Sequence, residues 1–123
     1  MKHLLVVGQG PAGISAAVYA KRGGAAVTVV ANGVGALEKA ERIENYYGFG
    51  EPLTGKELAA QGVEGAKRLG VEFIHGELVG LRFKDTLDGF IAELPTTTLE
   101  AAAVVLAMGT SRLAPPLPGL REL

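Results

Sequence analysis

The feature that most restricts the fold of this chain is a short glycine-rich segment near its start. Gly8, Gly10 and Gly13 stand at the spacing G-x-G-x-x-G. The apolar run 3–7 precedes them, and apolar residues at helical spacing follow from Pro11. Because the glycines stand between a predicted strand and a predicted helix, the segment indicates the phosphate-binding turn of a dinucleotide-binding fold.

Each glycine has its own physical task in such a turn. Gly8 allows the sharp turn out of the strand, Gly10 lets a pyrophosphate approach the backbone, and Gly13 lets the helix pack close to the strand. Pro11 suits the first helical position, where a missing N–H removes no helical hydrogen bond. The free N–H groups of the helix start then bind the phosphates. The alternative is that these are only turn glycines of an α/β protein.

The rest of the sequence alternates predicted strands and helices. Thr54 and Glu57 form a capping box that begins a second helix, which ends before Gly70. The predicted strands that follow the first helix cover residues 26–30, 71–75, 78–83, 90–94, 96–99 and 102–107. The pattern predicts one α/β domain over residues 1–123, a Rossmann-like parallel sheet with helices on it and an antiparallel β-meander crossover. The proline-rich tail, 115–118, is expected to be extended and exposed.

Composition excludes several classes of function. With 12 Lys and Arg against 13 Asp and Glu, the net charge of −1 gives no electrostatic reason to bind nucleic acid or an anionic membrane. The chain has no cysteine, which excludes a thiolate zinc site, a thiol nucleophile and a redox dithiol. His3 and His75 are isolated, so we expect structural roles and no metal site. The longest apolar stretch, 101–108, is too short to span a membrane, and we expect a cytoplasmic protein.

The ribose-binding position of the fold is unusual here. Dinucleotide sites often place a carboxylate at the end of the second strand, where this sequence has Ala31 and Asn32. Asn32 offers a hydrogen bond without charge, which disfavours an ordinary NAD site. The stretch 32–52 that follows has no clear period and contains Tyr46 and Tyr47, so it is predicted to be a functional loop.

Several motifs, in order along the chain, resemble the FAD-binding half of the thioredoxin reductase family. They occupy residues 8–20, 43–49, 53–58, 104–109 and 117–119. The resemblance implies FAD as the cofactor, with NAD(P) less favoured. It implies that the pyrophosphate lies on five residues of the glycine loop, namely Gly8, Gly10, Pro11, Ala12 and Gly13.

The same resemblance assigns further positions around the cofactor. Asn32 would lie near the adenosine ribose, and Asn45 would face the ribityl chain or the isoalloxazine ring. The backbone at Leu78 would border the adenine, and Gly109 would let the chain pass close to the flavin.

This sequence also departs from the family pattern. Tyr47 stands where proline is usual, and Met108 replaces a threonine. The family continues with an NADPH-binding domain that usually carries a Cys-x-x-Cys pair, and then returns to complete the FAD domain; we expect both parts to be absent from this chain. Without cysteine, dithiol-mediated disulfide reduction by this chain alone is excluded.

Three functions stay open at this point, none with a catalytic residue that we can name. The first is an FAD-binding protein or subunit that takes part in electron transfer with a partner. The second is a non-catalytic nucleotide-binding or interaction module, and the third is an NAD(P)-binding domain. The apolar sheet surface that the absent segments would cover predicts a homo-oligomer or a heteromeric redox partner.

Overall fold

The computed structural model describes residues 2–32 and 36–109, so the predicted tail at 115–118 lies outside the described residues. The elements in chain order are β1 (His3–Val7), α1 (Pro11–Arg22), β2 (Ala26–Ala31), the 3₁₀ helix η1 (Ala36–Lys39), α2 (Gly55–Arg68), β3 (Glu72–His75), β4 (Gly80–Phe83), β5 (Phe90–Glu93), β6 (Thr98–Ala101) and β7 (Ala103–Leu106).

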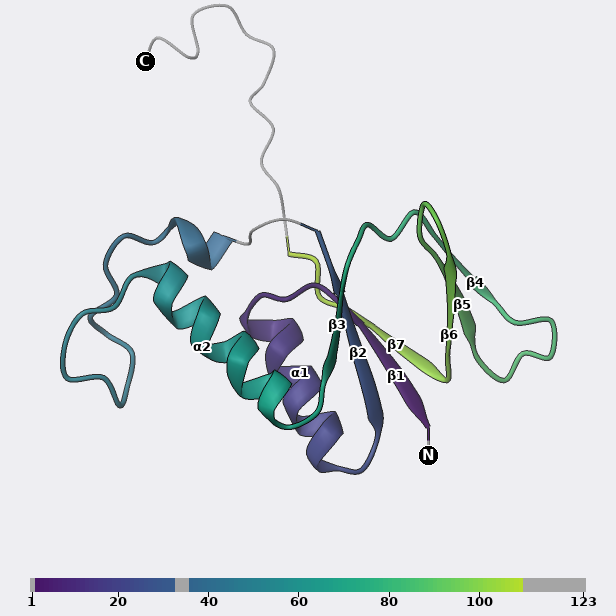
Figure 1. The fold of residues 1–123 in the computed structure, drawn as a ribbon, viewed down its shortest axis with the longest axis horizontal. Coiled ribbons are helices and arrows are strands. Elements are labelled where there is room, and N and C mark those ends of the chain that lie inside the picture. Colours follow the sequence, from purple (N-terminus) through teal and green to yellow (C-terminus); the bar gives the residue numbers. More distant parts are fainter. Residues whose placement is uncertain (1, 33–35, 110–123) are drawn as a thin grey trace, which may run out of the picture.

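Two sheets form the framework (Figure 1). A parallel sheet has the strand order β3-β2-β1-β7, and an antiparallel sheet has the order β4-β5-β6. Both α-helices lie on one face of the parallel sheet, and the antiparallel sheet lies on the other side. This arrangement confirms the predicted parallel sheet with helices and a β-meander crossover.

The two central strands are apolar on both faces because both faces are covered. Val6 and Val29 lie in the core cluster beneath the helices and are 0% exposed. Their chain neighbours Leu5 and Val30, at 0% and 1% exposure, lie in the second cluster beneath the meander. Alternation along each strand therefore sends successive side chains into two separate cores.

Both helices begin and end as their sequences predict. In α1, Pro11 occupies the first turn, and the chain leaves the helix at Gly23. In α2, the Thr54 hydroxyl accepts a hydrogen bond from the Glu57 N–H at 3.1 Å, which confirms the predicted cap. No helix in the described part of the chain is long and apolar enough to cross a membrane.

The segment between β2 and α2 has more structure than the sequence indicated. It contains η1, and Ile43 and Leu53 form a two-hydrogen-bond bridge that closes the loop between them. The last meander strand also starts later than predicted, at Thr98 instead of residue 96. The reason is that the Leu94 N–H donates to the Thr97 carbonyl at 2.9 Å, which places residue 96 inside the β5–β6 turn.

Candidate functional site

The first glycine of the loop is fixed by its neighbours on both sides. Gly8 has φ +113°, a conformation that side-chain-bearing residues rarely adopt. Its N–H donates to the Val30 carbonyl of β2 at 2.8 Å. A Cβ on Gly8 would overlap the carbonyl oxygen of Ala107, just after β7. Glycine is therefore required here by backbone packing, as the motif predicts.

The other two loop glycines differ from each other in a way that bears on function. A Cβ on Gly13 would overlap the Gly8 carbonyl oxygen and lie 3.4 Å from Val6 Cγ1, so helix and strand meet closely at this point. A Cβ on Gly10 would meet no atom within 4 Å. Internal packing therefore explains glycine at position 13 and leaves position 10 open to an approaching ligand.

The start of α1 presents hydrogen-bond donors beside this open position. Gly10 is the N-cap residue and makes no side-chain cap, and the first turn holds no acidic residue. Pro11 and Ala12 are exposed. Because the first N–H groups of a helix lack intrahelical partners and carry the positive end of its dipole, this uncapped turn favours an anion such as a pyrophosphate.

The parallel sheet gathers three other predicted positions at the same edge. Asn32, Leu78 and Gly109 follow β2, β3 and β7, as the glycine loop follows β1, and the carboxyl ends of parallel strands share one edge. The Gly76 N–H donates to the Ala31 carbonyl at 2.9 Å, which ties the chain after β3 to the end of β2.

These three positions differ in environment. Asn32 is exposed, and the side chain of Leu78 is half-buried against the core beneath the meander, which leaves its backbone as the part that can meet a ligand. Gly109 has φ +69° and open space where a Cβ would stand. The edge therefore offers polar backbone and one amide side chain, an arrangement suited to binding more than to acid–base catalysis.

Asn45 is exposed and belongs to the loop between η1 and α2, a loop that Figure 1 shows away from the ends of the strands. The same loop carries Tyr46 and Phe49, whose ring centroids are 5.7 Å apart, and Tyr47, which is 98% exposed. The loop begins beside the start of α2, because the Gly55 N–H donates to the Ala40 carbonyl at 2.7 Å. The predicted role of Asn45 at the flavin stays a prediction.

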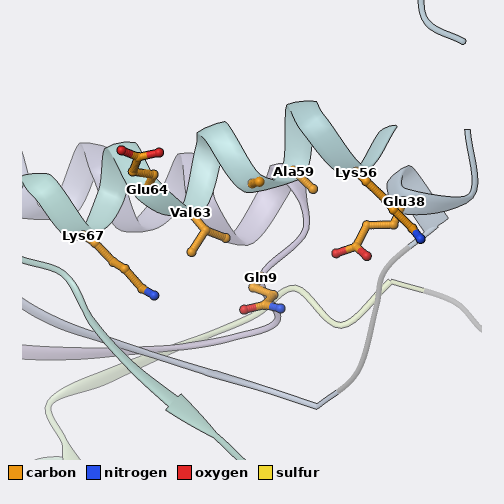
Figure 2. A pocket seen from close by; sticks show the side chains of 8 residues that line it. Gln9, Glu38, Lys56, Ala59, Val63, Glu64 and Lys67 are labelled. Atoms are coloured by element: carbon orange, nitrogen blue, oxygen red, sulfur yellow. The ribbon is translucent and has the colours of Figure 1, made fainter. Parts of the chain in front are cut away.

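A second hollow lies beside the glycine loop and was not predicted from the sequence (Figure 2). Its volume is about 590 Å³, and it is lined by Gln9, Glu38, Lys56, Ala59, Ala60, Val63, Glu64 and Lys67. Gln9 stands inside the glycine motif, but nothing in its spacing separates it from a solvent-facing residue. Lys67 is far away in sequence, so only the packing of α2 over the sheet brings it here.

Titratable groups do not gather into a catalytic cluster. Within residues 2–32 and 36–109, no group of three or more His, Asp or Glu residues is placed to hold a metal ion. Asp88 lies in the turn between β4 and β5, where the Thr86 hydroxyl and, secondarily, the Lys84 ammonium hold the pKa of its carboxyl below the ordinary value of 3.8. That turn follows β4, away from the ligand-binding edge, so this shift stabilises the turn and serves no reaction.

The residues present fit a dinucleotide such as FAD. The fit rests on the free space at Gly10 and on the uncapped first turn of α1. The five residues of the glycine loop would hold the pyrophosphate, with Asn32 on the ribose side.

Comparison with known proteins gives one consistent result. The model of the family described as pyridine nucleotide-disulphide oxidoreductase matches residues 2–123. Thioredoxin reductase of Bacillus subtilis is 32% identical over 98% of this chain, and the bifunctional thioredoxin reductase/thioredoxin of Mycobacterium leprae is 37% identical over 98%. This chain spans 38% and 27% of the lengths of those two proteins.

Solved structures agree with the sequence relatives. The atypical thioredoxin reductase of Desulfovibrio vulgaris Hildenborough superposes with a TM-score of 0.84 at 34% identity, covering 99% of this chain and 40% of its own. Thioredoxin reductase of Lactococcus lactis superposes with a TM-score of 0.87 at 27% identity, also covering 99% of this chain and 40% of its own. The described fold is therefore that of the FAD-binding part of these enzymes.

Proposed function

We propose that this chain, which belongs to the pyridine nucleotide-disulphide oxidoreductase family, binds FAD along the carboxyl edge of its parallel sheet and takes part in electron transfer with a partner. The family binds FAD, and the flavin, when bound, supplies the redox chemistry. The chain contributes binding and orientation. Residues 1–123 include no cysteine, so any redox dithiol that takes part lies outside them.

One observation carries the proposal. Gly8 and Gly13 are glycines because backbone atoms leave no room for a Cβ, whereas nothing in the described structure explains glycine at position 10. Close approach of a pyrophosphate to the backbone does explain it. The uncapped first turn of α1 supplies the matching donors and the favourable end of the helix dipole.

The need for a partner has separate support. Leu106 and Met108, at and after the end of edge strand β7, are 55% and 63% exposed. Strand β7 pairs with β1 on one side and, among the described strands, with nothing on the other. Exposed apolar residues beside an open strand edge are typical of surfaces that another chain or segment covers.

The test is an FAD titration of the purified chain, followed by its visible absorbance and flavin fluorescence. Wild type is expected to bind FAD saturably. Gly10→Val is expected to weaken binding at least tenfold, because the branched side chain occupies the space that the phosphate needs. Gly65→Val is the matched control, since Gly65 lies on α2 and its Cβ would also meet no atom within 4 Å.

Three results would contradict the proposal. Equal FAD affinity in wild type and Gly10→Val would remove the glycine loop from the binding site. A wild-type chain that does not bind FAD would favour the non-catalytic module. Tight binding of NAD(P), titrated in the same way, would favour an NAD(P)-binding domain.

A further inference from the structure

The hollow under α2 has the volume of a small-molecule site and is open to solvent, since Lys56, Ala60, Glu64 and Lys67 of its lining are exposed. Its volume of about 590 Å³ lies within the range of roughly 300–1,000 Å³ that is usual for ligand pockets. It is bounded by one face of α2, by η1 and by the glycine loop (Figure 2). These three elements meet only in the folded chain, so the hollow belongs to the tertiary structure.

One wall of this cavity is apolar. Ala59, Ala60 and Val63 line it from α2, at the spacing that places residues on one helix face. In Figure 2 the Val63 side chain points from the helix toward Gln9 on the glycine loop. A short hydrocarbon body is the chemical group that gains from contact with this wall.

The cavity lining carries charges of both signs, Lys56 and Lys67 against Glu38 and Glu64. Glu64 pairs with Arg68 in an exposed ion pair of 3.0 Å, one turn further along α2. Among the residues that the structure describes, Lys56, Lys67 and Glu38 form no ion pair. The preference for an anion therefore rests on the unpaired Lys67 ammonium and not on a net positive charge.

Lys67 and Gln9 supply directed donors at one end of the cavity. The Lys67 Nζ lies 5.5 Å from the centroid of the Phe73 ring of β3, a cation–π contact that holds the ammonium in place. The ring engages one side of the ammonium and leaves other N–H donors free. Gln9 adds an amide donor from the opposite wall, and Figure 2 shows both side chains directed into the same space.

We propose that this cavity is a second binding site, adjacent to the glycine loop, for a small organic carboxylate with an apolar body. The carboxylate would accept hydrogen bonds from Lys67 and Gln9, and the body would lie on Ala59, Ala60 and Val63. Apart from Gln9, its walls come from α2 and η1, which carry none of the residues assigned to the dinucleotide.

The test is a titration of hexanoate into the ¹⁵N-labelled chain, followed by nuclear magnetic resonance at constant ionic strength. Saturable shifts are expected at the Gln9 side-chain amide and at the backbone of Ala59, Ala60 and Val63. Lys67→Gln is expected to weaken hexanoate binding about tenfold, and Lys67→Arg to retain most of it. Lys2→Gln is the matched control, an exposed lysine outside the cavity.

Further measurements distinguish binding at this site from non-specific apolar binding and from binding at the dinucleotide edge. Hexylamine, with the same body and the opposite charge, is expected not to bind. Hexanoate is expected to bind the wild-type chain in the absence of FAD, so failure of FAD binding leaves this test intact. Equal affinity in Lys67→Gln, the same shifts from inorganic phosphate alone, or displacement of hexanoate by FAD would each overturn the proposal.

Discussion

The two faces of the parallel sheet are held by different kinds of contact. On the helix face, Gly13 lets α1 approach so closely that a Cβ would overlap backbone. On the meander face, the antiparallel sheet contributes Ala92, Leu99 and Ala101 to the core, and a polar contact joins the layers. There the His3 Nδ1 donates to the Glu100 carbonyl at 3.0 Å, and Nε2 accepts from the Thr28 hydroxyl at 2.8 Å.

That difference separates the positions that packing requires from those that packing leaves open. The helix face requires glycine where backbone meets backbone, and the one loop glycine free of that requirement, Gly10, is where our proposal places the pyrophosphate. On the meander face, a hydrogen bond from the His3 side chain to the Glu100 carbonyl joins one sheet to the other. Variants on each face should therefore fail in different ways.

Leu5→Ala should have the largest effect, because Leu5 is 0% exposed and central to the meander-face core. We expect the free energy of unfolding to fall by about 2–5 kcal/mol, from lost apolar contact and the cavity left behind. Urea denaturation followed by circular dichroism measures it. A loss below about 1 kcal/mol would mean that the meander adds little to the stability of the sheet.

Gly13→Ala should come next and tests the helix face. The new Cβ overlaps the Gly8 carbonyl oxygen, so α1 must shift, at a cost of about 3 kcal/mol. Gly65→Ala is the control: its Cβ has free space on α2, and alanine should stabilise that helix by up to about 1 kcal/mol. Equal stability of Gly13→Ala and wild type would show that the close approach is not required.

His3→Ala should have a moderate effect on the meander face. It leaves the Thr28 hydroxyl, in a residue 2% exposed, without its partner, and we expect a loss of about 1–3 kcal/mol. The double variant His3→Ala/Thr28→Val should recover part of this loss, because the orphaned hydroxyl is then gone. If the double variant recovers no stability in the same urea assay, the loss in His3→Ala comes from packing and not from the hydrogen bond.

Asp88→Asn should have the smallest effect and should depend on pH. Because the folded-state pKa of Asp88 is lowered, its carboxylate stabilises the fold above the unfolded-state pKa, and this contribution is lost as pH falls through the folded-state pKa. Wild type should therefore exceed Asp88→Asn in stability at pH 7 and match it under strongly acidic conditions. A difference that persists unchanged in acid would assign the effect to something other than ionisation.

Much of the fold could be predicted from local patterns. Continuous apolar runs indicated β1, β2 and β7, and the capping box indicated α2, because each signal lies within a few residues. The glycine spacing predicted the loop, and the structure separates the roles of its glycines. The β6 boundary was missed because it depends on the hydrogen bond that Leu94 donates to Thr97, a contact between residues of a turn.

The cavity could not be predicted in this way. Lys67 and Gln9 line the same cavity only because α2 crosses above the glycine loop. Neither residue belongs to a sequence pattern that indicates a ligand-binding site. Gly55 shows the same limit: a Cβ there would overlap the Leu37 carbonyl oxygen, yet in the sequence it is one glycine after a capping threonine. Such contacts between distant segments are properties of the packed chain.

The close packing of the Gly8 backbone against Ala107 also bears on the order in which the molecule can be assembled. The glycine loop is synthesised well before its backbone partner Ala107, and His3 is likewise synthesised 97 positions before Glu100, the residue to which it donates a hydrogen bond. At about 5–20 residues per second, that interval lasts seconds. A nascent chain therefore lacks one wall of the glycine loop during that interval, and the proposed binding of a cofactor there would follow completion of the sheet.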